Sequence, residues 1–195
     1  MDWLKRSFSS LRPESRRPSV RRVTVDEPLV VSSPKIGFFN LLGATAQAIV
    51  DADKQGFRAL FASLEESNDV APKCDVLMIY AHVQTDGSIA GSADGLRDII
   101  RKANAVIVVV ASENEAKNYI AASRRTGYGQ ANLVMTLKRK DAAFTNFFAQ
   151  LFEKMQRGTS MPVGWVQLAP QAPGATHGNC PESIFSAEIS HIVFK

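Results

Sequence analysis

The chain has 195 residues, 45% hydrophobic and 22% charged, which is enough apolar material for one packed domain. No apolar run reaches the roughly 18 residues that a membrane-spanning helix needs, and Cys74 and Cys180 fit neither a zinc site nor a disulfide scaffold. Residues 1–22 carry seven basic and two acidic side chains, a net charge of +5 (7 − 2), against −1 (16 − 17) for the remainder.

Residues 1–33 are rich in serine, arginine and proline, which is typical of a flexible arm. Four apolar side chains in this arm would share one face of a helix that docks on a partner or an anionic membrane surface, the alternative being a disordered terminus: Trp3, Leu4, Phe8 and Leu11. The arm also contains "RRPSV", in which two arginines precede a candidate phosphorylation site at Ser19. We expect a cytoplasmic protein that is peripheral at the membrane if the arm binds lipid.

The folded body, residues 34–195, is predicted to begin with a short strand, "KIGFF". The next stretch, "NLLGATAQAIVDADKQGFRALFASLEES", has apolar residues at helical spacing and predicts two helices divided at "DADKQG". Two unbroken apolar runs, "VLMIYA" and "AVIVVVA", predict strands buried on both faces, as in a parallel sheet covered by helices. "ANLVMTL" would be a third such strand, and "EISHIVF" a last strand at an edge of the sheet.

Helical patterns alternate with these strands. "SADGLRDIIRKA" predicts a short helix capped by Ser92, and "NEAKNYIAASRRTG" predicts a helix that ends at Gly127. "KDAAFTNFFAQLFEKMQRG" has a wide apolar stripe that we assign to the core, and Ser160 would cap a last helix with Pro162 in its first turn. The alternation predicts a three-layer α/β/α sandwich with a mostly parallel central sheet.

Two polar residues follow predicted strands at the point where each strand ends, His82 and Ser112. The carboxyl ends of neighbouring parallel strands share one edge of a sheet, where sites form. One interpretation is a catalytic pair, with His82 as the base and Ser112 as the nucleophile. The other is structural: backbone groups satisfy the His82 ring, and Ser112 caps a helix starting at Glu113, with Glu115 completing a capping box. We favour the structural interpretation.

Turns that flank the third strand carry basic side chains, which would form either a weak basic rim or a solvated turn: Arg124, Arg125, Lys138, Arg139 and Lys140. We expect no cofactor, because neither GxxxxGK[ST] nor GxGxxG occurs. Histidines 82, 177 and 191 lack the spacing of metal ligands, and the slightly negative charge of residues 23–195 argues against specific nucleic-acid binding by the body.

The order of these motifs resembles that of CHAT domains, the caspase-like peptidase fold of many bacterial proteins. "CDVLMIYAHVQTDG" stands where such domains have "aDVLHLAGHG", which aligns His82 with their histidine. "VIVVVASEN" stands where they have "LVVLSACET", which aligns Ser112 with their cysteine, and "NLVMTLKRKDAAFTNFFAQLFEKMQRG" is similar to their next strand and helix. The resemblance covers residues 36–195 and implies a caspase-like fold.

The chain departs from the CHAT pattern at the site itself. Val83 replaces a glycine after the histidine, Lys138 replaces a tryptophan, and no cysteine stands at position 111 or 112. A thiolate forms readily near neutral pH, whereas a serine hydroxyl needs a stronger push from an adjacent base, a third group to orient that base, and an oxyanion hole. The resemblance therefore implies a non-catalytic module for protein interaction or signalling, whose basic arm docks on a partner or a membrane. The alternatives are a peptidase-type hydrolase that uses His82 with a Ser112 nucleophile, and an unrelated flavodoxin-like scaffold.

Overall fold

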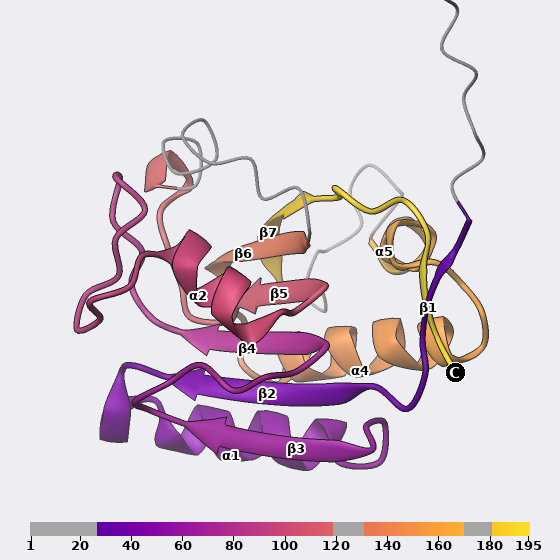
Figure 1. The fold of residues 1–195 in the computed structure, drawn as a ribbon, viewed down its shortest axis with the longest axis horizontal. Helices are drawn as coiled ribbons and strands as arrows, with labels where there is room; N and C mark the ends of the chain where they lie inside the picture. The colour runs from indigo at the N-terminus through magenta and orange to yellow at the C-terminus, as the bar shows by residue number, and fades with distance from the viewer. Residues whose placement is uncertain (1–26, 119–130, 170–180) are drawn as a thin grey trace, which may run out of the picture.

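A mixed, mostly parallel sheet of six strands forms the centre of the protein (Figure 1). The computed structural model describes residues 27–118, 131–169 and 181–195. The strands lie in the order β3-β2-β4-β5-β6-β7, and only β7 runs antiparallel to its neighbour. Their bounds are β2 Lys35–Asn40, β3 Ser63–Ser67, β4 Val76–Tyr80, β5 Ile107–Val110, β6 Asn132–Lys138 and β7 Glu182–Ser186.

Helices cover both faces of this sheet, as the alternating pattern predicted. On one face lie α1 (Gln47–Phe57), α4 (Ala142–Gln156) and α5 (Met161–Leu168), and on the other lies α2 (Leu96–Ala103) (Figure 1). Every residue of β4 and β5 is buried, because alternate side chains enter two separate cores. The three-layer α/β/α sandwich predicted from the sequence is therefore confirmed. None of the helices in the described ranges is long and apolar enough to cross a membrane.

The apolar stripe of α4 forms the centre of the larger core. Its buried members are Phe144, Phe147, Phe148, Leu151, Phe152 and Met155. The ring of Phe152 lies edge-on to Phe57 of α1 and to Phe61, with centroids 5.6 Å and 5.1 Å away. The assignment of this stripe to the core is therefore confirmed.

The segment between β2 and β4 differs from its prediction. A short 3-10 helix, η1 (Gly43–Thr45), precedes α1, which runs without interruption through "DADKQG". Two properties keep this stretch helical: Asp53 is buried beside a cation, and Gly56 lies against Thr145 of α4, where a larger residue would not fit. The second predicted helix is wrong, because residues 58–62 form the turn after α1 and residues 63–67 form the edge strand β3.

The last predicted strand is also placed differently. Ile192–Phe194 forms β8, which pairs in parallel with β1 (Leu29–Val31) in a separate two-stranded sheet. The antiparallel edge of the main sheet is instead β7, where no strand was predicted. Residues 29–31 belong to the predicted arm, so ordered structure begins before Pro34, where the apolar triplet "LVV" can pair with β8.

Two predicted helix caps are not formed by their side chains. The cap residue of α2 is Gly95, and the hydroxyl of Ser92 accepts a hydrogen bond from the Asp94 amide instead. Ser160 does precede α5, with Pro162 in the first turn, but its side chain makes no capping hydrogen bond. Of the helix predicted to end at Gly127, residues 116–118 are helical, and the remainder lies outside the described residues.

Candidate functional site

The carboxyl ends of β4 and β5 form one edge of the sheet, and both predicted site residues lie there. The two strands pair in parallel from Val76↔Ile107 to Ile79↔Val110. The residues that follow them, Ala81 and Ala111, are therefore neighbours, and the Ala111 amide donates to the Ile79 carbonyl at 2.7 Å. The expectation that His82 and Ser112 end adjacent parallel strands is confirmed.

The hydroxyl of Ser112 is hydrogen-bonded to the backbone of Ala81. Its Oγ accepts a hydrogen bond from the Ala81 amide at 2.9 Å and donates its proton to the Ala81 carbonyl at 2.5 Å. A hydroxyl has only one proton to donate, so none remains for a base. The predicted capping role is wrong, because helical structure starts at residue 116 and the Ser112 hydroxyl bonds to Ala81 at the end of the neighbouring strand.

Two asparagines extend this connection between the strand ends. Asn114 Oδ1 accepts from the Val83 amide at 2.8 Å, and its Nδ2 donates to the Ala81 carbonyl at 3.3 Å. Asn118 Nδ2 donates to the Val83 carbonyl at 2.8 Å. We call Ser112, Asn114 and Asn118 the strand-end clamp. Neither asparagine was among the predicted site residues. They stand four residues apart in "NEAKN", on either side of residue 116, where helical structure starts, so helical spacing alone does not bring them together.

His82 lies beside the clamp and lines the same hollow as Asn114 and Asn118. Its side chain is exposed, while Val83 is buried in the core beside α2, because successive side chains of an extended chain face opposite ways. In the described part of the chain, no hydrogen bond joins His82 to Ser112. An open hollow of about 450 Å³ lies here, lined by His82, Val83, Gln84, Glu113, Asn114, Glu115, Asn118 and Leu137.

A buried ion pair lies beneath this edge. The Arg139 guanidinium, in the turn after β6, contacts both carboxylate oxygens of Asp53 at 2.7 Å, and the two side chains are 6% and 0% exposed. Tyr80 donates its hydroxyl proton to Asp53 at 2.6 Å, and Thr145 donates to Asp53 at 2.5 Å. Burial, and then the negative charge of Asp53, raise the pKa of Tyr80 well above its usual value, so the phenol stays protonated.

Arg139 also forms hydrogen bonds with the two residues on either side of Ser112. Its guanidinium donates to the Ala111 carbonyl at 3.0 Å, and its amide donates to Glu113 Oε1 at 2.9 Å. The guanidinium carbon lies 3.8 Å from the centroid of the Phe144 ring, a cation–π contact. The ion pair therefore joins α1, β4, α4 and the strand-end clamp.

The predicted basic rim is only partly exposed. Arg139 is buried, so it cannot belong to a surface, because its partner Asp53 draws it into the core. Lys138 is exposed at the end of β6, whereas Lys140 is half-buried with its Nζ 3.5 Å from Glu182. Arg124 and Arg125 lie outside the described residues, as do the arm residues Trp3, Leu4, Phe8 and Leu11 and the candidate phosphosite Ser19.

The crevice between β2 and β4 is a second place where doubly wound sheets bind ligands. The five parallel strands follow the flavodoxin-like order, whose direction reverses at this point. The buried Asn40 ends β2 here and donates to the Gly43 carbonyl at 3.1 Å and to Gln47 at 3.2 Å, and it accepts from the Leu42 amide at 3.1 Å. Its amide therefore holds the loop that follows β2, beside a hollow lined by residues from the ends of β2 and β3.

Cys74 lies at the opposite end of β4 from His82. It is buried, its thiol is 3.4 Å from the Pro72 carbonyl, and burial raises its pKa to about 12. It therefore cannot stand in for the cysteine that CHAT domains place after the next strand. Within the described ranges, no three histidine, cysteine or acidic side chains gather as metal ligands. No protein-family model matches the sequence, and no curated protein is significantly similar to it.

The raised pKa of Cys74 predicts a protected thiol. At pH 9 an unperturbed thiol is largely ionised, whereas a pKa of about 12 leaves on the order of one thiolate in a thousand. We expect iodoacetamide to label Cys74 at least 100-fold more slowly in the native protein than in urea, as measured by site-resolved mass spectrometry. Comparable rates in the two states would contradict the buried position.

Proposed function

We propose that the protein is a non-catalytic α/β module, divergent from CHAT domains, that acts by binding a protein partner. The strand-end clamp carries this proposal. A serine nucleophile must present its proton to a base, whereas Ser112 donates that proton to the Ala81 carbonyl and His82 faces solvent. Ser112 occupies the position that aligns with the peptidase nucleophile, and in this protein its side chain connects the ends of β4 and β5.

The surface that the clamp supports is suited to recognition. Residues 82–90 project beyond β4 as a loop, closed on itself by the bridge between Val83 and Ile89. The exposed polar side chains His82, Gln84 and Glu113 lie around the hollow at its base. A loop held by side chains of the segment after β5 loses less conformational entropy when it binds, so the clamp would favour binding at this surface.

Ser112→Ala tests the structural role. The substitution removes both hydrogen bonds to Ala81 and leaves two backbone groups with one partner fewer, which should lower the free energy of unfolding by about 1–3 kcal/mol. Urea unfolding followed by circular dichroism measures the change. Ser92→Ala, which removes only a hydrogen bond within its own loop, is the matched control and should change stability by less than about 0.5 kcal/mol.

The function itself is tested by comparing variants in the cells that make the protein. We expect proximity labelling to recover a reproducible partner set with wild type, and fewer of these partners with His82→Ala and Ser112→Ala, which alter the recognition surface or its support. Purified wild type is assayed in parallel on a fluorogenic peptide library. Hydrolysis that disappears in both variants would favour the hydrolase interpretation and overturn the proposal, as would the absence of any reproducible partner.

The basic arm is the second element of the proposal, and it rests on sequence alone. Residues 1–22 carry a charge of +5, which would draw the protein to acidic partners or to anionic lipid. Replacing Arg16, Arg17, Arg21 and Arg22 with serine should weaken binding to phosphatidylserine vesicles at least tenfold in a sedimentation assay. Arg97→Ser on α2 is the control. Equal binding by both proteins would limit the arm to other roles.

A further inference from the structure

β3 is an open edge of the central sheet. Its one neighbour among the described strands is β2, and the opposite side of β3 faces no other strand there. Figure 1 shows β3 as the outermost strand, with α1 alongside it on one face. An edge of this kind presents unpaired backbone groups that an extended chain can bind.

The register shows which backbone groups of β3 are open. The backbone amides of Lys35 and Leu41 both point toward β4. Backbone groups of successive residues in a strand point to opposite sides, so the N–H and C=O groups of Ile36 point toward β3. Ile36 lies opposite Leu64, and in a parallel ladder a residue bonds to the two neighbours of the residue opposite. The N–H and C=O groups of Leu64 and, by alternation, of Glu66 are therefore directed outward.

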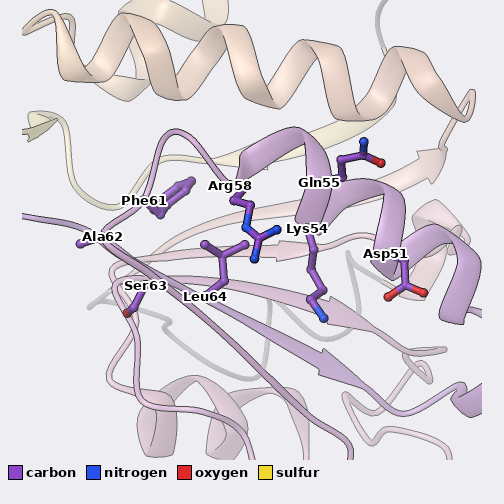
Figure 2. Close-up of a pocket in the computed structure, with 8 residues that line it drawn as sticks. All are labelled: Asp51, Lys54, Gln55, Arg58, Phe61, Ala62, Ser63 and Leu64. Atoms are coloured by element: carbon purple, nitrogen blue, oxygen red, sulfur yellow. The ribbon is translucent and has the colours of Figure 1, made fainter.

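A basic hollow adjoins this edge on the face that α1 covers. It has a volume of about 770 Å³ and is lined by Asp51, Lys54, Gln55, Arg58, Phe61, Ala62, Ser63 and Leu64. Figure 2 shows Lys54 and Arg58 extending from α1 toward the strand, over Leu64. Lys54 is paired with Glu66 at 2.6 Å, whereas Arg58 is exposed and has no ion pair within the described ranges. Arg58 can therefore pair with a carboxylate.

A second hollow borders the same edge on the opposite face. It has a volume of about 580 Å³ and is lined by Glu65, Ser67, Val70, Ala71, Pro72, Lys73 and Lys102. Val70 is 68% exposed, the highest value among the large apolar side chains exposed in the described residues. Side chains of an added strand would alternate between the two hollows, so one set would meet Arg58 and the other would meet Val70.

We propose that the open edge of β3 binds an extended segment of a partner protein by strand addition. The segment would place an acidic side chain toward Arg58 and apolar side chains over Val70. This inference rests on the proposed protein-binding function and adds a second binding surface to the hollow beside His82. A second copy of this chain fits less well, because two-fold antiparallel pairing centred on β3 would set Glu65 opposite Glu65 of the other copy, and like charges directly opposite destabilise a sheet.

The test uses the full chain as bait for a displayed library of random peptides of about eight residues, long enough to cover a strand of ordinary length. Binding of the selected peptides is measured by fluorescence anisotropy. We expect alternating sequences with an acidic residue on one side. Arg58→Glu should weaken their binding about tenfold, and replacing the acidic residue with lysine should restore it. Arg97→Glu, the same change at an exposed arginine on α2, should have no effect.

Amide exchange separates strand addition from side-chain docking. The outward amides of Leu64 and Glu66 should exchange rapidly in the free protein and at least tenfold more slowly with bound peptide. The amide of Glu65 already donates within the sheet and should change little. Leu64→Pro removes an outward amide without removing a ladder hydrogen bond, so it should abolish binding in a protein whose circular dichroism remains that of a folded α/β protein.

Each negative result has a distinct meaning. Failure to select any peptide, selected peptides that bind Arg58→Glu as well as wild type, or a β3-mediated dimer in light scattering would overturn the edge proposal. If a cellular partner is recovered equally by Arg58→Glu and Leu64→Pro, the edge is wrong while the protein-binding function stands. Hydrolysis that requires His82 would instead remove the proposed function, whatever the edge binds.

Discussion

Replacing Asp53 with alanine is expected to lower the free energy of unfolding by about 3–5 kcal/mol, the cost of leaving a buried charge without its partner. Asp53 is fully buried and supplies both carboxylate oxygens to Arg139. Without it, the guanidinium would keep its hydrogen bond to Ala111 but lose its counterion. Urea unfolding measures the change.

The destabilisation should come from the orphaned cation rather than from lost contacts. The double variant Asp53→Leu/Arg139→Met removes both charges, so it should recover at least half of the stability lost in Asp53→Ala. Asp51→Ala, two residues away on the exposed side of the same helix, is the matched control and should change stability by less than about 0.5 kcal/mol. An Asp53→Ala variant as stable as this control would contradict the structure.

Replacing Phe152 with alanine should produce a loss of similar size, about 3–5 kcal/mol, for a different reason. The ring is fully buried between two helices and β8, with Phe61 at 5.1 Å and Phe194 at 6.1 Å. Truncation leaves a cavity that α4 cannot close, because the aromatic side chains on either side of the ring hold one another in place. Urea unfolding of the variant gives the value.

A second aromatic side chain provides the comparison. Phe185 of the edge strand β7 is half-buried and contacts Trp165, with ring centroids 4.8 Å apart and the ring planes tilted by 32°. Phe185→Ala removes a ring of the same size from the border of the core, so we expect less than half the loss seen at Phe152. Equal losses would mean that burial does not decide the effect at these positions.

The strands and helices with the strongest patterns were predictable. Unbroken apolar runs located β4, β5 and β6 because a central strand needs apolar side chains on both faces. β3 was missed because only Leu64 must face the core, and "SLEES" carries two glutamates that are uncommon in strands. The helical spacing of Leu60, Phe61 and Leu64 is a coincidence. The first two belong to the turn that follows α1 and pack against the core from there, whereas Leu64 belongs to β3.

The site was predictable only to the level of its topology. That His82 and Ser112 lie at neighbouring strand ends follows from the order of the strands. The orientation of the Ser112 hydroxyl does not follow from the strand order, because a serine at this position can either cap its own helix or bond to Ala81. Ala81 lies 31 residues before Ser112 in the chain, so local sequence does not indicate that bond. Arg139 was read as part of a solvated basic turn for the same reason: its partner Asp53 is 86 residues away.

The small sheet of β1 and β8 determines how the arm is attached to the body. Leu29 donates to the His191 carbonyl at 2.7 Å, and Lys195 donates to the Val31 carbonyl at 2.9 Å. Tension applied to the arm along β1 would pull β1 past its parallel partner β8. The hydrogen bonds between the two strands would then be loaded in shear and all at once, rather than broken one after another. Phe194 of β8 packs on Phe152, so the force passes into the aromatic core. An arm held by a partner or a membrane would therefore be mechanically anchored to the body.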